Sequence, residues 1–285
     1  MVLRVWARPT VAALYMSRIC LFAVCFLCGV SSVTAADAPS REIRPLARAH
    51  AHNDYRHDRP LLDALDHGFC SVEADIFLVG GELLVGHGRS ELRKGRTLEK
   101  LYLKPLGERA RKNGGRVYQD GPRFTLLIDI KTDGAAVYVQ LDKLLTRYAT
   151  VISGSSGKKF QRRAIDVIIS GDRPKAEIAA DETRFCGIDG RLADLDSKQP
   201  ADLLPLISDR WTSHFKWRGK GPMPADEKEK LRQIVEKAHA SERRVRFWAT
   251  PENPAMWKEL SAAGVDLINT DRLAELQKFL EQGPR

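Results

Sequence analysis

The sequence lacks the features that mark several common classes of protein. It has 5 Cys in 285 residues, and the two that lie beyond residue 35 have neither C-x-x-C nor zinc-finger spacing. No G-x-G-x-x-G follows the first strand-like segment, which argues against a Rossmann dinucleotide site. No run of five or more Lys or Arg occurs, so neither nucleic-acid binding nor a polybasic membrane patch is indicated. We find no internal repeat and no low-complexity segment.

The first 35 residues have the three parts of a secretory signal peptide. Three arginines precede the apolar run 19–30, and the small residues Val33 and Ala35 precede an expected cleavage site after Ala35. The apolar run is shorter than the ~20 residues that cross a bilayer, and an uncleaved membrane anchor is the alternative. We therefore expect a signal peptide over 1–35, a linker over 36–46 and one secreted or periplasmic domain over 47–285, with no stable membrane span.

Loss of the signal peptide would change both the charge and the cysteine content. It removes three of the 46 Lys and Arg and none of the 37 Asp and Glu, which leaves a mildly basic chain whose surplus charge is scattered. Anionic substrates remain compatible with that charge. Only Cys70 and Cys186 would remain, both in apolar strand-like segments, where a small buried thiol is expected; a disulfide between them is the alternative in an oxidising compartment.

Eight short apolar segments alternate with helix-like stretches in the remaining chain. The expected strands are Ala47–His52, Ser71–Phe77, Phe124–Ile130, Asp166–Ser170, Phe185–Asp189, Leu204–Ser208, Val245–Ala249 and Asp266–Thr270. Apolar strands that alternate with helices indicate a parallel sheet covered by helices. Eight such units in about 250 residues favour a single-domain α/β (β/α)₈ TIM barrel over an open doubly wound sheet.

The connections of this barrel carry recognisable local signals. Residues 80–88 are expected to form a turn and a short extra strand, and Ser153–Lys159 a loop rich in Gly, Ser and Lys. Asn253 and Pro254 are the N-cap and first residue expected of one late helix, and Asp271 is the expected cap of the last one.

Three carboxylates are expected at the carboxyl ends of neighbouring strands. Period-two alternation places Glu73 and Asp75 on the inward face of the second strand, and the third strand adds Asp129 and, two residues later, Lys131. Two adjacent buried carboxylates repel one another unless a cation binds between them. Oxygen ligands at the mouth of a barrel suit one divalent hard cation, Ca²⁺ or Mg²⁺.

Two histidines accompany these acids. His52 ends the first strand and His87 follows the extra strand after Asp75. Imidazoles beside a hard-cation site are suited to act as general base and general acid in a displacement at phosphorus. Either histidine taken alone is as well explained by an ordinary surface or core position, and only the combination with the acids favours catalysis.

These motifs, in this order, resemble a known group of enzymes. Residues 51–55 (AHNDY), 71–75 (SVEAD), 85–88 (VGHG) and 127–131 (LIDIK) are similar to the phospholipase C-like phosphodiesterase superfamily, which includes glycerophosphodiester phosphodiesterases, phosphoinositide phospholipases C and spider sphingomyelinase D. Within it the sequence most resembles the branch named for the altered inheritance of mitochondria protein of yeast. The last strands, 245–250 and 263–271, resemble the end of the glycerophosphodiesterase barrel.

The resemblance implies a role for each motif residue. His52 and His87 match the catalytic pair, and Glu73, Asp75 and Asp129 match the metal-binding acids, with Asp129 standing where Glu is usual. Asn53 matches a further metal ligand of the eukaryotic phospholipases C. Lys131 and Trp248 match positions that contact the phosphate or line the substrate pocket. The implied partner is a small-molecule or lipid phosphodiester. The implied enzyme is a phosphoric diester hydrolase, or a lyase that releases a cyclic phosphate.

Two other functions compete with this interpretation. A zinc-dependent amidohydrolase-type barrel is suggested by His50 beside His52 and by Asp271, although the middle strands offer no further His or Lys ligand. A catalytically silent secreted binding module would keep the fold and a structural cation.

Overall fold

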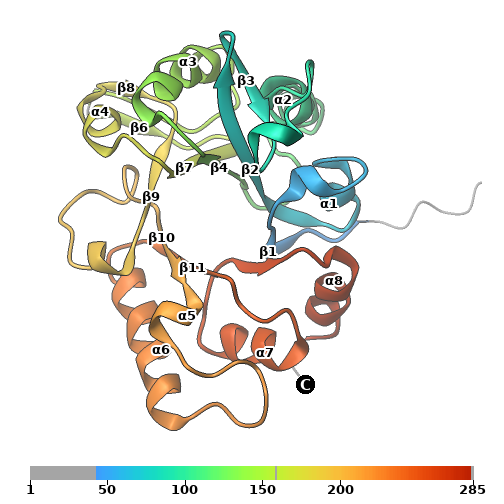
Figure 1. Cartoon of the computed structure of the whole chain (residues 1–285), viewed down its shortest axis with the longest axis vertical. Helices are drawn as coiled ribbons and strands as arrows, with labels where there is room; N and C mark the ends of the chain where they lie inside the picture. The colour runs from blue at the N-terminus through green and yellow to red at the C-terminus, as the bar shows by residue number, and fades with distance from the viewer. Residues whose placement is uncertain (1–42, 158, 284–285) are drawn as a thin grey trace, which may run out of the picture. The chain divides into compact units, whose positions relative to one another are not determined.

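The computed structural model describes residues 43–157 and 159–283 (Figure 1). The expected signal peptide and residues 36–42 of the expected linker lie outside the described residues. In the part that is described, no helix is both long enough and apolar enough to cross a bilayer.

Eight parallel strands form a nearly closed barrel, surrounded by helices in Figure 1. Each predicted strand is present within a few residues of its predicted ends, and the prediction Phe124–Ile130 is observed unchanged. The barrel strands are β1 (Leu46–Ala51), β2 (Phe69–Val79), β4 (Phe124–Ile130), β7 (Ile165–Gly171), β9 (Gly187–Gly190), β10 (Leu206–Arg210), β11 (Arg244–Trp248) and β12 (Ile268–Thr270). The fold predicted from the alternating pattern is confirmed.

The sheet closes through its first and last strands. The order around the barrel is β11, β10, β9, β7, β4, β2, β1, β12, so β1 pairs with both β2 and β12. Between β11 and β12 the backbone nitrogens of Asp266 and Leu267 both donate to the carbonyl of Val245, at 3.0 and 3.1 Å. These bonds bring the last two strands together, so that all eight carboxyl ends surround one mouth.

Short strands and short helical turns lie in the connections between the barrel strands. They are β3 (Glu82–Val85), β5 (Gly154–Ser156), β6 (Lys159–Gln161), β8 (Thr183–Arg184), η1 (Asp54–Arg56), η2 (Arg89–Glu91), η3 (Glu99–Leu103) and η4 (Leu192–Asp194). The extra strand predicted after β2 is β3, which runs antiparallel to it. The segment predicted to be a loop over Ser153–Lys159 instead contains β5 and the start of β6, and these two strands and β8 form a small separate sheet.

Amphipathic helices cover the outside of the barrel. They are α1 (Leu62–Asp66), α2 (Lys104–Lys112), α3 (Gly134–Thr146), α4 (Lys175–Ala180), α5 (Trp211–His214), α6 (Ala225–His239), α7 (Pro254–Ala262) and α8 (Leu273–Gln282). The predicted cap of α7 is confirmed, because the Asn253 side chain accepts a hydrogen bond from the Met256 nitrogen at 2.9 Å. The predicted cap of α8 is wrong, because Arg272 rather than Asp271 takes the N-cap position.

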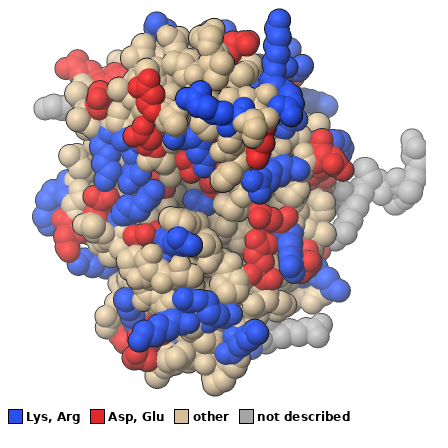
Figure 2. Space-filling model, viewed as in Figure 1, with Lys and Arg blue, Asp and Glu red and all other residues tan. Residues whose placement is uncertain are grey.

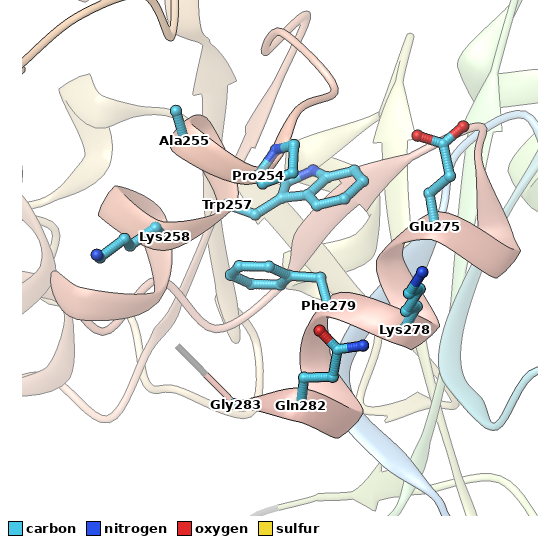
Figure 3. A pocket seen from close by; sticks show the side chains of 9 residues that line it. All are labelled: Pro254, Ala255, Trp257, Lys258, Glu275, Lys278, Phe279, Gln282 and Gly283. Atoms are coloured by element: carbon cyan, nitrogen blue, oxygen red, sulfur yellow. The ribbon is translucent and has the colours of Figure 1, made fainter. Parts of the chain in front are cut away.

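Helices α7 and α8 also enclose an apolar groove on the outside of the barrel (Figure 3). The rings of Trp257 and Phe279 lie in it with centroids 5.6 Å apart, and the groove holds about 490 Å³. None of the predicted site residues lines this groove.

The interior of the barrel is filled in layers. Leu127, Ile168, Leu206 and Leu267 form an apolar cluster inside it. Towards the amino ends of the strands, Arg244 donates to the Thr125 hydroxyl at 2.8 Å. Polar side chains lie at the carboxyl ends. The apolar layer therefore separates the polar mouth from the opposite end, as in other filled barrels of this type.

Candidate active site

Strand register brings the three predicted carboxylates together. In the β2–β4 pair Asp75 lies directly opposite Asp129, and Glu73 is two residues earlier on the same face of β2. One ligand oxygen from each of these three residues lies within 4.8 Å of the others. Glu73 and Asp75 are buried and Asp129 is half-buried. Like charges directly opposite one another are destabilising, so this arrangement needs compensating positive charge.

The two oxygens of Asp75 have very different surroundings. Its Oδ2 lies 2.6 Å from the Tyr55 hydroxyl, 2.7 Å from the Lys131 Nζ and 3.0 Å from the His87 Nδ1. Its Oδ1 is buried and has no hydrogen-bond partner among the described residues. A buried carboxylate oxygen without a donor is costly unless a cation binds it. This orphaned oxygen and the all-oxygen donor set fit a Ca²⁺ or Mg²⁺ ion.

Glu73 is held by a buried arginine from across the barrel. Arg246 of β11 forms an ion pair with Glu73 and donates through Nε to the Asn269 Oδ1 at 2.9 Å. The His50 Nε2 lies 3.3 Å from the same Glu73 oxygen. Burial alone would raise the pKa of Glu73, but Arg246 and His50 outweigh it and hold that pKa well below its usual range. Glu73 is therefore ionised and fixed in position.

The pKa of Asp129 reflects both its burial and the excess of negative charge in the cluster. Burial raises the pKa of Asp129 to about 6; Lys131, 3.4 Å away, opposes this shift, and Asp75 and Glu73 add to it. Burial lowers the pKa of Lys131, but Asp75 and Asp129 outweigh burial and raise it, so Lys131 is charged. One lysine therefore does not fully neutralise the two aspartates.

Both predicted catalytic histidines face this cluster, and each meets a carboxylate through Nδ1. The His52 Nδ1 lies 2.7 Å from the Asp271 Oδ1, and the His87 Nδ1 contacts Asp75 as described above. Burial lowers the pKa of His52, but the hydrogen bond to Asp271 and the charge of Glu73 outweigh burial and raise it. A carboxylate on Nδ1 fixes the ring and leaves Nε2 to exchange a proton; the Asn53 Nδ2 lies 3.3 Å from the His52 Nε2.

The other predicted site residues lie at the same mouth. Asn53 has a left-handed backbone (φ 47°), and its Oδ1 accepts a hydrogen bond from Tyr55 at 2.6 Å, beside Asp75. Trp248 is half-buried at the end of β11, with the Arg210 guanidinium 5.6 Å from its ring centroid. The structure thus brings all eight predicted residues to one end of the barrel.

The geometry gives no support to the zinc alternative. His50 is fully buried, with Nδ1 2.7 Å from the Ser71 hydroxyl and Nε2 facing Glu73, and burial together with Arg246 lowers its pKa to about 3. Within the described ranges, the group of His, Cys, Asp and Glu side chains close enough to hold a metal is the carboxylate trio, without His50 or His52.

Three contacts at this mouth were not assigned from the sequence. Tyr55 joins Asn53, Asp75 and His87, and it lies within the 51–55 motif. Arg246 stands two residues before Trp248, on the same face of β11, which is the signal that could have placed it at the axis. Asp271 holds His52 instead of capping a helix.

Comparison with known proteins agrees with this geometry. The AIM6-like phosphodiesterase domain family matches residues 37–186, and the glycerophosphoryl diester phosphodiesterase family matches 244–274. Altered inheritance of mitochondria protein 6 of Eremothecium gossypii is 28% identical over an alignment of 295 positions, which covers 89% of this chain and 76% of that protein. Its homolog from Arthroderma benhamiae is 30% identical over an alignment of 268 positions, which covers 81% of this chain and 83% of that protein.

A solved structure supports the same architecture. A glycerophosphodiester phosphodiesterase from Parabacteroides distasonis aligns with a TM-score of 0.50 at 17% identity, over 84% of this chain and 98% of that one. This likeness concerns the fold. The family match spans more than half of the chain, and the Arthroderma relative is similar over most of both proteins; the chain therefore belongs to the AIM6-like phosphodiesterase domain family.

Proposed function

We propose that this protein cleaves a phosphodiester by general acid–base catalysis with His52 and His87. The observation that carries the proposal is the pairing of two carboxylate-anchored imidazoles with the Glu73–Asp75–Asp129 cluster at one barrel mouth. Either imidazole alone would have an ordinary explanation. Both beside an oxygen-rich cation site form the set of groups that a displacement at phosphorus requires.

The chain's own residues divide the work of the reaction. With Nδ1–H donated to its carboxylate, one imidazole accepts the proton of the nucleophile at Nε2. The other, protonated, delivers a proton to the leaving alkoxide. Lys131 lies next to Asp75 and supplies a fixed positive charge for the non-bridging oxygens of the phosphate. Trp248 provides an apolar wall at the end of β11 for the alcohol portion of the substrate.

Glu73, Asp75 and Asp129 would hold one divalent cation, with Asn53 as a further oxygen ligand. When bound, such an ion neutralises charge that develops on the phosphate oxygens. The orphaned Asp75 Oδ1 supports this assignment, because within the carboxylate cluster it is a buried oxygen with no donor among the described residues. The choice between Ca²⁺ and Mg²⁺ rests on the size and flexibility of the site.

A kinetic experiment tests the acid–base assignment and separates the two roles. His52→Ala and His87→Ala should each lower kcat on an ordinary phosphodiester by about 10²–10⁴, with little change in KM. A p-nitrophenyl leaving group departs without a proton, so it should largely rescue the variant that lacks the acid and not the one that lacks the base. His67→Ala, a half-buried histidine in another part of the chain, is the matched control and should retain wild-type kinetics.

The products identify the nucleophile. Phosphorus NMR distinguishes a phosphomonoester, made when water attacks, from a cyclic phosphate, made when a hydroxyl of the substrate attacks. Near-wild-type turnover by both histidine variants on every phosphodiester tested would overturn the proposal and favour the binding-module interpretation.

We also propose that the domain is exported, on the strength of the signal-peptide pattern in residues 1–35. Amino-terminal sequencing of the mature protein from its native cell should begin at Ala36. A cytosolic protein that retains Met1 would contradict this.

A further inference from the structure

From Asp129 onwards around the mouth, the neighbouring strands β7, β9 and β10 present serines and arginines. Ser170, Asp189 and Ser208 lie in β7, β9 and β10, and both hydroxyls donate to Asp189 at 2.7 Å. Asp189 is fully buried. Arg173 and Arg191 follow the carboxyl ends of β7 and β9. Figure 2 shows Lys and Arg side chains gathered beside a hollow near the middle of the view, on the side where Figure 1 places β9 and β10.

Arg191 folds back onto Asp189 and Ser208 instead of extending fully into solvent. Its Nη1 donates to the buried Asp189 Oδ2 at 2.8 Å and to the Gly190 carbonyl at 2.9 Å. Within residues 43–157 and 159–283, the hydrogen bonds of this guanidinium all pass through Nη1, which leaves Nε and Nη2 available. The side chain is 26% exposed, so a ligand in the mouth can reach it.

Arg173 lies between Arg191 and the carboxylate cluster. Its electrostatic neighbours include Arg191 and Asp189 on one side and Asp129 on the other. Its Nη1 donates to the Gly171 carbonyl at 2.9 Å, while its Nε is buried and has no partner among the described residues. Burial, and then the charge of Arg191, lowers the pKa of Arg173. A second positive charge next to a half-buried guanidinium is unfavourable on its own.

The acids nearby do not balance this pair of arginines. Asp189 is shared between them, Asp129 faces Lys131, and Asp194 is paired with Lys175 at 3.0 Å. Two guanidiniums with unused donors thus share the buried carboxylate of Asp189. Fixed arginine donors of this kind suit a phosphate or carboxylate oxygen.

We propose that Arg173 and Arg191 bind a second anionic group of the substrate. The inference rests on the proposed function: the scissile phosphodiester lies at the carboxylate cluster, and a phosphate or carboxylate elsewhere on the same small molecule lies at the two arginines. The preferred substrate is then a phosphodiester that carries a further negative charge, which a simple dialkyl phosphate lacks.

Matched substrates test the selectivity. Ethyl p-nitrophenyl phosphate, its 2-carboxyethyl analogue and its 2-phosphoethyl analogue share one leaving group and differ in the second anion. Wild-type kcat/KM should be about tenfold or more higher for the charged analogues, the usual value of one charged hydrogen-bonded contact. Arg173→Gln should bring that ratio close to one, and Arg173→Lys should keep part of it.

A control variant excludes a general effect of net charge. Arg162→Gln removes the same charge just before the amino end of β7, the strand whose carboxyl end precedes Arg173, and Arg162 is exposed. It should keep the wild-type ratio. If Arg162→Gln and Arg173→Gln lower the ratio equally, the selectivity comes from the overall field of the protein and the proposal is wrong.

A binding measurement tests this inference independently of the proposed reaction. Calorimetry compares 1,3-propanediol bisphosphate with propyl phosphate, and the wild type should bind the bisphosphate about tenfold more tightly. Suppose that the protein turns over phosphodiesters yet shows neither the higher kcat/KM for the charged analogues nor the tighter binding of the bisphosphate. That result overturns the second anion site and leaves the proposed function intact. A bisphosphate preference that disappears in Arg173→Gln, in a protein that turns over no phosphodiester, supports the anion site and overturns the proposed function.

Natural headgroups show whether the second anion belongs to a soluble molecule or to a lipid. Glycerophosphoinositol 4-phosphate and phosphatidylinositol 4-phosphate in detergent micelles are each compared with the form that lacks the 4-phosphate. Selectivity in the first pair alone indicates a soluble substrate, and selectivity in both pairs a lipid one. No selectivity in either pair contradicts the proposal.

Discussion

The two halves of the barrel mouth each bury an aspartate, and they satisfy it in opposite ways. On β9, Asp189 receives hydrogen bonds at both oxygens, from Ser170, Ser208 and Arg191. On β2, Asp75 receives all its donors at Oδ2 and none at Oδ1. Both side chains are fully buried. Burial of a carboxylate therefore does not mark a reactive site by itself; of these two aspartates, Asp75 is the one with an oxygen that has no partner among the described residues.

Arg246 connects the two halves. It belongs to β11, beside the arginine-lined half, and its charge meets Glu73 of the acidic half. The acidic half thus holds two fixed cations, Arg246 at Glu73 and Lys131 at Asp75. Burial nevertheless raises the pKa of Asp129 to about 6. Arg246 and Lys131 offset part of the charge of the buried carboxylates, and a bound divalent ion would neutralise the rest.

The largest effect is expected when an Asp→Asn substitution is made in each half separately and the two variants are compared. Asp75→Asn removes a proposed cation ligand and the partner of Lys131, so kcat/KM should fall at least about 100-fold. Asp189→Asn should lose less activity and more stability, about 1–3 kcal/mol, because an amide nitrogen then faces Arg191. Steady-state kinetics and urea unfolding of the two variants measure both quantities. A larger activity loss in Asp189→Asn would place the chemistry in the wrong half.

The second prediction concerns the ion pair between the halves. Arg246→Met leaves Glu73 as an uncompensated buried charge and should lower the free energy of unfolding by about 3–5 kcal/mol at pH 7. Adding Glu73→Gln removes that charge and should recover most of the loss. Arg162→Met, at an exposed position, is the control and should change stability by less than about 0.5 kcal/mol. A double variant as unstable as Arg246→Met would show that the charge is not the cause.

Strand positions and the acidic trio followed from local pattern, which is why they could be predicted. Apolar runs marked all eight strands, and period-two alternation placed Glu73 and Asp75 on the inward face. Register then added what no local pattern holds, since Asp75 lies opposite Asp129 only because β2 and β4 pair in that frame. The Arg246–Glu73 contact joins residues 173 positions apart, so a spacing rule could not have found it.

Two local predictions failed because a nearby residue offered a better hydrogen bond. The Thr270 hydroxyl accepts from the Arg272 nitrogen at 2.9 Å at the start of α8, which frees Asp271 to hold His52. The Gly- and Ser-rich segment after α3 was predicted as a loop because its composition is typical of turns. It forms β5 instead, since β6 and β8 supply the backbone partners on either side.

A smaller effect is expected from adding the cation. Ca²⁺ or Mg²⁺ at about 100 times its Kd should stabilise the fold by about 2.7 kcal/mol, which corresponds to a Tm rise of roughly 5–10 °C for a domain of this size. Asp129→Asn should lose most of the rise, while Asp166→Asn, near the other end of the barrel and paired with Arg123, should keep it. An equal Tm rise in both variants would argue against the carboxylate cluster as the binding site.

The smallest effect is expected from the cysteines, which lie one in each half of the barrel. Cys70 is in β2 and Cys186 precedes β9; both are buried free thiols, and burial raises the pKa of each to about 12. Thiolate is the reactive form, so at pH 8 neither should react with Ellman's reagent until the chain is unfolded in guanidinium. A reducing agent should leave Tm unchanged. A disulfide between Cys70 and Cys186 would instead give a loss of about 2–4 kcal/mol in the free energy of unfolding on reduction.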